Sequence, residues 1–196
     1  MTSIGKARLE AFSDGVIAII ITIMVLELKP PHLETLADLK PLWPIFLSYV
    51  LSFLYLGIYW NNHHHMLHAA RHINGVVMWA NLHLLFWLSL IPFTTAWMGE
   101  NHFGSAPMAL YGFILFMAAA AYWILQLSII TEHGHDSLLK RAVGLDLKGK
   151  LSPFLYMGGI AAAFFSPILS GVIYFLIALL WIVPDRRIEK AMRTME

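Results

Sequence analysis

The sequence predicts an all-α integral membrane protein with six transmembrane helices, on three observations. Hydrophobic residues make up 59% of the 196 residues and charged residues 13%, and the mean hydropathy is +0.67. This balance is far more apolar than that of a soluble domain of the same length. Long uncharged stretches recur along the chain, and its basic residues gather on one side of the predicted topology.

The first span has the shortest apolar core. Its uncharged stretch, residues 15–26, holds twelve residues, and only Thr22 interrupts its apolar character. A hydrocarbon core needs about 20 residues, so we expect Asp14 either at the membrane boundary or buried against protein. Glu10 and Asp14 stand where a signal peptide would be basic, which predicts that this segment is retained.

Four further uncharged stretches supply the remaining spans, and the last of them is divided. Residues 151–184 would form a helix of about 50 Å, too long for a hydrocarbon core of about 30 Å. Pro167 breaks this stretch into two short helices. We therefore predict one six-helix transmembrane domain over residues 1–196. The predicted spans are 8–28, 42–62, 73–98, 104–131, 151–166 and 168–184.

The distribution of basic residues predicts the orientation. Six spans put both termini on one side, and a cytoplasmic N-terminus then leaves only Lys29 and Lys40 outside. The other eleven Lys and Arg residues are cytoplasmic, as the positive-inside rule requires. We expect a multi-pass protein of the cell membrane with cytoplasmic termini. The outer segment after the first span carries Leu33, Leu36 and Leu39 at every third position, which predicts a short amphipathic helix.

One face of the first helix permits two interpretations. Ile19 and Leu26 fall on one line at about 100° per residue, with Thr22 and Ile23 beside it. Such a face can pack in a core or, repeated around a symmetry axis, line a narrow hydrophobic pore. Thr22 likewise can bond back to the carbonyl of Ala18 or offer its hydroxyl to a pore.

The carboxylate of Asp14 requires a partner from another segment. Asp14 projects about 140° away from the line just described, toward neighbouring helices. Arg8 lies six residues earlier, outside the spacing of helical neighbours. We favour a buried His63 or His64 that holds Asp14 or Ser13. The alternative is a solvated acid in the first turn, stabilised by the helix dipole.

A run of histidines ends the second span: W-N-N-H-H-H-M-L-H-A-A-R-H. His64 and His68, or His68 and His72, are four residues apart and could share a metal on one helical face. No acidic residue falls in the run to orient such ligands, so we favour hydrogen-bonding roles. His83, inside the third span, is expected to bond across to a neighbouring helix.

Missing motifs exclude several function classes. Without cysteine the chain has no disulfide, thiolate metal site or cysteine nucleophile. It has no T-V-G-Y-G filter and no ladder of arginines, and no acidic residue lies near the middle of a span, which argues against proton-driven pumping. Hydrolase, metalloprotease and nucleotide-binding motifs are also missing, so we predict a protein that is not an enzyme.

The start of the first helix resembles the signature of a known family. Arg8, Phe12, Ser13 and Asp14 spell R-x-x-x-F-S-D before an apolar helix. This is similar to the transmembrane protein 175 family of potassium channels, which has two-repeat lysosomal members and single-repeat prokaryotic members. The six spans and the W-N-N-H-H-H ending of the second helix fit the single-repeat branch over essentially the whole chain.

The resemblance implies a homotetramer in the lipid bilayer whose first helices line a central pore. An isoleucine or leucine seven residues after the motif phenylalanine narrows the pore in this family, and Ile19 stands at that position. Leu26 is a further constriction, and either Thr22 or Ile23 forms the layer between them. The motif serine and aspartate tie the first helix to its neighbours. Potassium is the permeant ion, no cofactor or nucleic acid is involved, and some two-repeat members also pass protons.

We therefore expect a potassium-selective cation channel whose ring of Ile19 is the filter and a candidate gate, with proton permeation left open. The first alternative is an intramembrane metalloenzyme built on histidines. A second alternative is a secondary cation carrier with alternating access, and a third is a purely structural membrane subunit. The histidines of the metalloenzyme interpretation are His63, His64, His65, His68 and His83.

Overall fold

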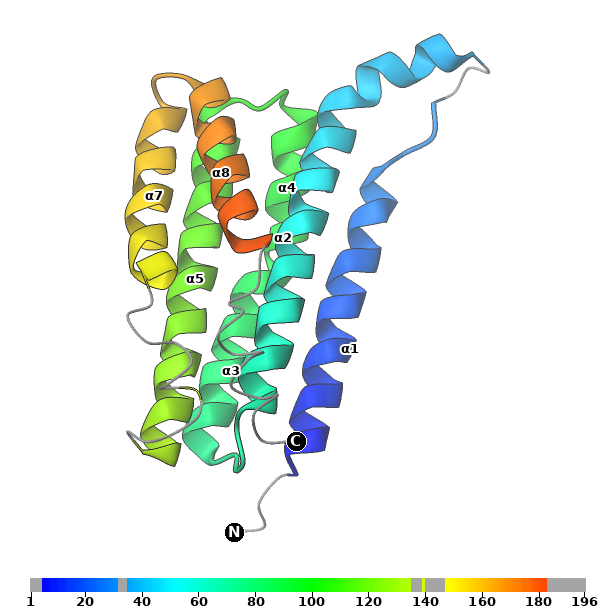
Figure 1. The fold of residues 1–196 in the computed structure, drawn as a ribbon. Helices are drawn as coiled ribbons and strands as arrows, with labels where there is room; N and C mark the ends of the chain where they lie inside the picture. The colour runs from blue at the N-terminus through cyan, green and yellow to red at the C-terminus, as the bar shows by residue number, and fades with distance from the viewer. Residues whose placement is uncertain (1–4, 32–34, 135–138, 140–146, 183–196) are drawn as a thin grey trace.

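The computed structural model describes residues 5–31, 35–134, 139 and 147–182, and it is built from helices (Figure 1). Within these residues the helices form six rods, which confirms the predicted six-helix fold. The helical elements are α1 (Lys6–Met24), η1 (Val25–Glu27), η2 (Leu36–Leu42), α2 (Trp43–His68), α3 (Gly75–Ser89), α4 (Ile91–Glu100), α5 (Ser105–His133), α7 (Leu147–Ala163) and α8 (Pro167–Ile182).

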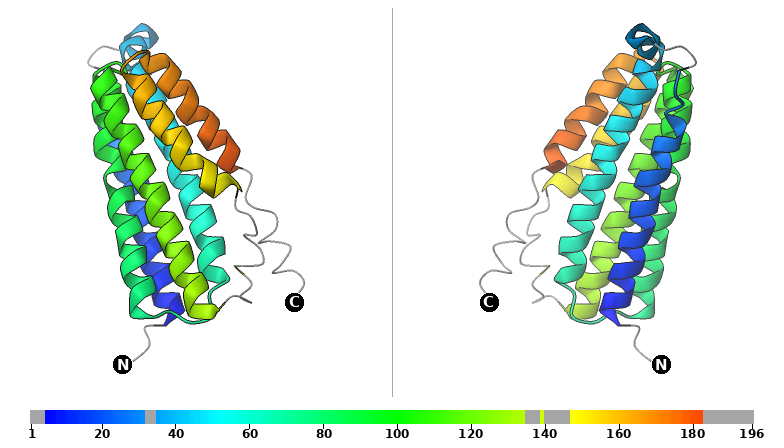
Figure 2. Two further views of the ribbon diagram at one scale, coloured as in Figure 1. Left: turned by 90° about the vertical axis from the view of Figure 1, so that its left-hand side faces the viewer. Right: turned by 90° about the vertical axis from the view of Figure 1, so that its right-hand side faces the viewer.

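Four of the rods are long and apolar enough to cross a membrane. They cover Lys6–Glu27, Leu36–His68, Gly75–Glu100 and Ser105–His133. The helices α7 and α8 are shorter, at 17 and 16 residues, or about 25 Å each. They pack on α2 and α5 along the half of the bundle away from the N-terminus (Figures 1 and 2). Residues 183 and 184 of the last predicted span lie outside the described residues.

The third rod is broken, which the prediction of one span over residues 73–98 did not include. The helix α3 ends at Ser89 and α4 begins at Ile91. Pro92 lies in the first turn of α4, where its ring cannot donate a hydrogen bond and would clash with the carbonyl of the preceding turn. The break therefore follows from Pro92, and the two helices continue as one rod of 26 residues.

The predicted outer helix is present as a 3₁₀ helix, η2. Thr35 precedes it, and the Oδ2 atom of Asp38 accepts hydrogen bonds from the Thr35 backbone N–H (3.0 Å) and hydroxyl (2.6 Å). This capping box fixes the start of η2. Leu36 and Leu39 are exposed, as an amphipathic surface helix requires, and Leu33 lies outside the described residues.

A cluster of buried tyrosines joins α2, α5, α7 and α8. The Tyr55 hydroxyl donates to the Tyr174 carbonyl (2.6 Å), and the Tyr174 hydroxyl donates to the Met108 carbonyl (3.2 Å). The rings of Tyr111 and Tyr156 pack against Tyr55 and Tyr174. These contacts give the buried Tyr55 and Tyr174 hydroxyls a partner where water is excluded, and they fix α8 on the bundle.

The packing around Tyr174 predicts different effects for two adjacent glycines. A Cβ on Gly159 would overlap the Tyr174 ring, whereas a Cβ on Gly158 would meet no atom within 4 Å. Gly159→Ala should lower the free energy of unfolding by about 1–3 kcal/mol, the cost of overpacking a core. Gly158→Ala is the matched control and should leave it unchanged or higher. Thermal unfolding in detergent measures both, and equal midpoints would contradict this packing.

Candidate functional site

The helix α1 has one face inside the subunit and one face outside it. Its buried side chains recur every three or four residues and pack against α2, α3 and α4. The opposite face is exposed, with Phe12 51%, Ile19 61% and Leu26 72% accessible. Ile23 is 41% accessible and Thr22 is exposed beside it. The buried face consists of Leu9, Ser13, Ile17, Ile20 and Met24.

The five exposed residues Phe12, Ile19, Thr22, Ile23 and Leu26 are called the α1 stripe below. Within α1, at about 100° per residue, Phe12 lies within about 20° of Ile19 and Ile23 within about 40°. Leu26 follows in the 3₁₀ helix η1 and is also exposed. The stripe therefore runs straight along the helix. Arg8 is also exposed, in the first turn of α1. The residues predicted to constrict a pore thus lie outside the core of the subunit.

The Thr22 hydroxyl donates to the carbonyl of Ile19 (2.9 Å). Of the two possibilities left open for Thr22, the bond back along the helix is present, but its acceptor is Ile19 and not Ala18, because a helical threonine reaches either the third or the fourth preceding carbonyl. The bond uses the hydroxyl proton, so the oxygen can act only as an acceptor toward any further partner. Thr22 and Ile23 are both exposed, so the structure places each of them on the α1 stripe.

A buried chain of hydrogen bonds fastens the inner face of α1. Asn81 of α3 donates from Nδ2 to the Ser13 hydroxyl (2.9 Å) and accepts at Oδ1 from Nε2 of His63 on α2 (2.7 Å). The Ser13 hydroxyl in turn donates to the Leu9 carbonyl (2.8 Å). Since the Asn81 oxygen can only accept, Nε2 of His63 carries a proton. Three helices thereby meet through Ser13, Asn81 and His63.

Two further bonds lie toward the surface. The Oδ1 atom of Asp14 accepts from the indole Nε1–H of Trp60 on α2 (3.0 Å). Lys6 donates to the His68 carbonyl at the end of α2 (2.8 Å) and lies 3.7 Å from the carboxylate of Glu10. Asp14 is half-buried and Trp60 is half-exposed, so water screens this second group of contacts.

The two histidines predicted to hold the motif, His63 and His64, lie in different places, and neither contacts Asp14 or Ser13 through a direct hydrogen bond that the structure shows. His63 reaches Ser13 through Asn81, and Trp60 is the hydrogen-bond donor to Asp14. The His64 ring is exposed and stacks against Trp60 with centroids 6.3 Å apart. Sequence reasoning missed the roles of Trp60 and Asn81. A usable signal was present for Asn81, because an amide inside an apolar span must find partners.

The histidine run does not gather ligands for a metal. The rings of His64 and His68 stack face to face, with centroids 6.1 Å apart. His72 stacks instead on His133 of α5, at 6.3 Å. Among the residues that the structure describes, no three His, Asp or Glu side chains are grouped to hold an ion. His83 accepts from Trp87 in the same helix (2.9 Å), so the expected bond to a neighbouring helix was wrong.

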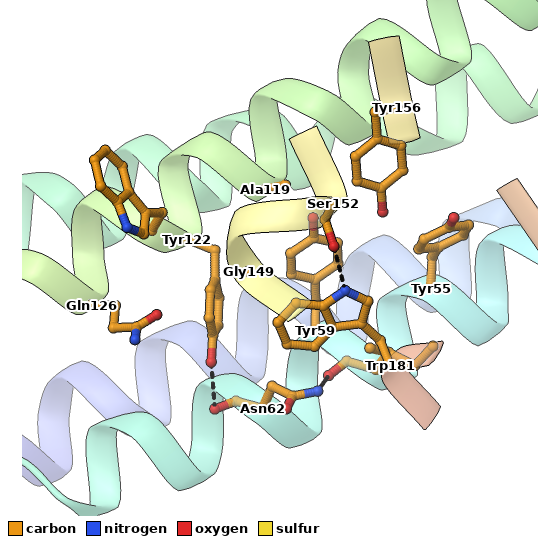
Figure 3. Close-up of a pocket in the computed structure, with 12 residues that line it drawn as sticks. Tyr55, Tyr59, Asn62, Ala119, Tyr122, Gln126, Gly149, Ser152, Tyr156 and Trp181 are labelled. Atoms are coloured by element: carbon orange, nitrogen blue, oxygen red, sulfur yellow. Dashed lines mark hydrogen bonds between the residues drawn. The ribbon is translucent and has the colours of Figure 1, made fainter. Parts of the chain in front are cut away.

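A cavity of about 40 Å³ lies where α7 and α8 meet α2 and α5 (Figure 3). The rings of Tyr59, Tyr122 and Trp181 surround it, and Trp181 donates from Nε1 to the Ser152 hydroxyl (2.8 Å). A cavity of this size holds a few water molecules at most. It shares no residue with α1, so the α1 stripe and the motif residues form a separate site.

Comparisons with known proteins identify the family. The family model for the endosomal/lysosomal potassium channel TMEM175 matches residues 8–92. A potassium channel of Chryseobacterium sp. (strain P1-3) is 53% identical over 188 residues, which cover 96% of this chain and 98% of the relative. The human endosomal/lysosomal proton channel TMEM175 is 31% identical over 96 residues, 42% of this chain and 19% of the human protein.

A solved structure agrees with the sequence matches. The crystal structure of a lysosomal potassium-selective channel TMEM175 homologue from Chamaesiphon minutus covers 92% of this chain and 97% of its own, with a TM-score of 0.78 and 28% sequence identity. These relatives are named as ion channels and not as enzymes, so they give no support to a metalloenzyme or a carrier. The chain therefore belongs to the TMEM175 family of multi-pass membrane proteins.

Proposed function

We propose that this chain is the subunit of a potassium-selective cation channel in the cell membrane, with both termini in the cytoplasm. Four copies assemble with their α1 helices around a central axis, and the α1 stripe lines the pore. The names of the relatives support potassium as the permeant ion. The observation that carries the proposal is the exposed stripe itself, on a helix whose other face is fastened by hydrogen bonds inside the subunit.

The small residues beside the stripe favour contact with other α1 helices over contact with lipid. Ala11, Gly15 and Ala18 are exposed between the large residues. A Cβ on Gly15 would meet no atom within 4 Å, so packing within the subunit does not require this glycine. Small residues let helices approach closely in membranes. The exposed end of α8, in contrast, presents Ile168 at 81% and Leu169 at 51%, as a lipid-facing surface does.

A ring of four Ile19 side chains selects by the cost of dehydration. The aliphatic ring offers no oxygen to replace the water that a cation must shed there. Potassium loses its water more cheaply than sodium because its charge is spread over a larger radius, and it therefore passes more readily. Conduction through such a ring is slow. A hydrophobic constriction also closes by losing its water, so the same ring serves as a gate.

The buried hydrogen bonds position this ring. Ser13 lies six residues before Ile19, and its links through Asn81 to His63 fix the rotation and height of α1 against α2 and α3. Asp14 and Lys6 add contacts to Trp60 and to the end of α2. A rotation of α1 by one residue would turn Ile19 away from the exposed side of the subunit. It would also break the hydrogen bonds from Ser13 through Asn81 to His63. The motif residues therefore act on the pore by positioning α1.

Replacing Ile19 tests the filter. Ile19→Asn places amide oxygens at the ring, so the penalty for sodium should fall and the ratio of sodium to potassium permeability should rise by about tenfold, or about 1.4 kcal/mol. Flux into liposomes that hold only this protein, under sodium and potassium gradients, measures the ratio. Ile168→Asn changes an exposed isoleucine of α8 and should leave the ratio unaltered. If Ile19→Asn keeps the wild-type selectivity, Ile19 is not the filter.

Replacing Asn81, which makes buried hydrogen bonds, and Trp60, which makes a half-exposed one, tests how α1 is positioned. Asn81→Leu leaves the buried Ser13 and His63 without their shared partner and should cost about 1–3 kcal/mol of unfolding free energy. Trp60→Phe removes a half-exposed bond that water can replace, so its cost should stay below about 1 kcal/mol. Thermal unfolding gives both values, and liposome flux should fall further in Asn81→Leu. A larger effect of Trp60→Phe on either readout would refute this order.

A further inference from the structure

The loop that joins α2 to α3, residues 69–74, is hydrogen-bonded to the end of α5, where one histidine accepts two of its backbone N–H groups. We call this loop the α2–α3 corner. Nε2 of His133 lies 2.8 Å from the backbone nitrogen of Arg71 and 3.0 Å from that of His72, and both N–H groups donate to it. Nδ1 of His133 lies 2.9 Å from the Ile129 carbonyl oxygen, one turn earlier in α5.

These bonds define the proton state of the His133 ring. Backbone N–H groups can only donate, so Nε2 must be an unprotonated acceptor. The Ile129 carbonyl can only accept, so Nδ1 must carry the single proton of a neutral imidazole. Adding a second proton at Nε2 would direct an N–H at two other N–H groups. Protonation therefore removes both bonds to the corner and replaces them with repulsion.

The charged and titratable groups around this ring come from the corner and from α5. The corner contributes Arg71 and His72, whose ring lies parallel to His133 at 5°. From α5, Glu132 accepts a hydrogen bond from Asn74 Nδ2. Asn74 in turn caps α3 by accepting from the Val77 backbone N–H (2.9 Å). Within the described residues, the corner thus meets α5 through His133 and Glu132.

The corner lies between the residues that hold the pore helix. Trp60 and His63 precede it on α2, and Asn81 follows it on α3. Lys6 of α1 also donates to the His68 carbonyl just before the corner. Loosening the corner therefore loosens the frame against which α1 is positioned.

We propose that His133 is a proton-sensitive latch. In its neutral form it binds the Arg71 and His72 backbone N–H groups to α5, and on protonation it releases them while the Asn74–Glu132 bond persists, which loosens the corner and alters the hold on α1. The opening of the latch is a property of the subunit alone. Only its effect on conduction rests on the proposed function.

Amide hydrogen exchange of the full chain in lipid nanodiscs tests the latch. After correction for intrinsic exchange, protection of the Arg71 and His72 amides should fall by about tenfold when the pH is lowered from about 7.5 to about 5.5. His133→Gln keeps an acceptor oxygen but has no ring nitrogen that can take up a proton. Protection of the Arg71 and His72 amides in this variant should therefore not change with pH. His72→Gln is the matched control, because it removes the ring that stacks on His133 but keeps the backbone N–H that donates to it, and its protection should still fall with pH as in the wild type.

Two results would overturn the latch: wild-type protection that is constant between the two pH values, or an equal loss of protection in His133→Gln. The wild-type comparison decides alone if the glutamine variant does not fold. Potassium flux into liposomes with equal pH on both sides tests the effect on conduction. Flux should differ at least about threefold between the two pH values in the wild type and not in His133→Gln. Absence of flux at both values refutes the channel proposal, and the exchange result still decides the latch.

Discussion

A buried amide on α3 positions the first helix against the rest of the subunit. Asn81 has no accessible surface, and it satisfies Ser13 of α1 and His63 of α2 at the same time. In hydrocarbon an unpartnered polar group costs several kcal/mol, so this bonding pattern strongly disfavours other rotations of α1. The apolar residues of α1 could not select a rotation alone, since isoleucines occur on every side of the helix.

The division of α1 into two faces follows from this constraint. Once Ser13 points inward, Ile17 and Ile20 follow it into the core, with 0% and 3% of their surface accessible. Ile19 must then point outward, although its side chain is chemically identical to that of Ile20. Composition does not distinguish the filter candidate from its neighbour; the register of one serine does. This explains how a helix without charge in its apolar core can carry a specific function.

The fold could be predicted from the sequence because lipid restricts the solutions. Uncharged stretches of spanning length must be helices, and the basic residues then orient them. Local features, such as helix breaks and hydrogen-bond partners, were harder to predict from the sequence. The break at Pro92 depends on where its ring falls in the third rod, and the Thr22 acceptor depends on a rotamer. His83 bonds within its own helix because Trp87 stands four residues later.

For the candidate site, the sequence predicted which face of the first helix each residue lies on, but not which residues on other helices bind it. The direction of Asp14 away from the Ile19–Leu26 line follows from helical geometry, whereas its donor Trp60 comes from a helix whose distance no single sequence reveals. The family resemblance supplied the expectation that this line faces a pore. The arrangement of one subunit agrees with that expectation because the stripe is exposed, and the assembly of four subunits around it is what we propose.

Cysteine accessibility during conduction tests this assembly, because the chain has no cysteine of its own. Single variants Ile19→Cys and Ile20→Cys change adjacent residues, of which Ile19 is exposed and Ile20 is buried. The measurement is potassium flux into liposomes before and after addition of a silver salt, which enters narrow aqueous pores and binds thiolates. We expect silver to block flux through Ile19→Cys and to leave Ile20→Cys conducting. Flux through Ile19→Cys that persists after addition of silver would contradict a pore lined by the α1 stripe.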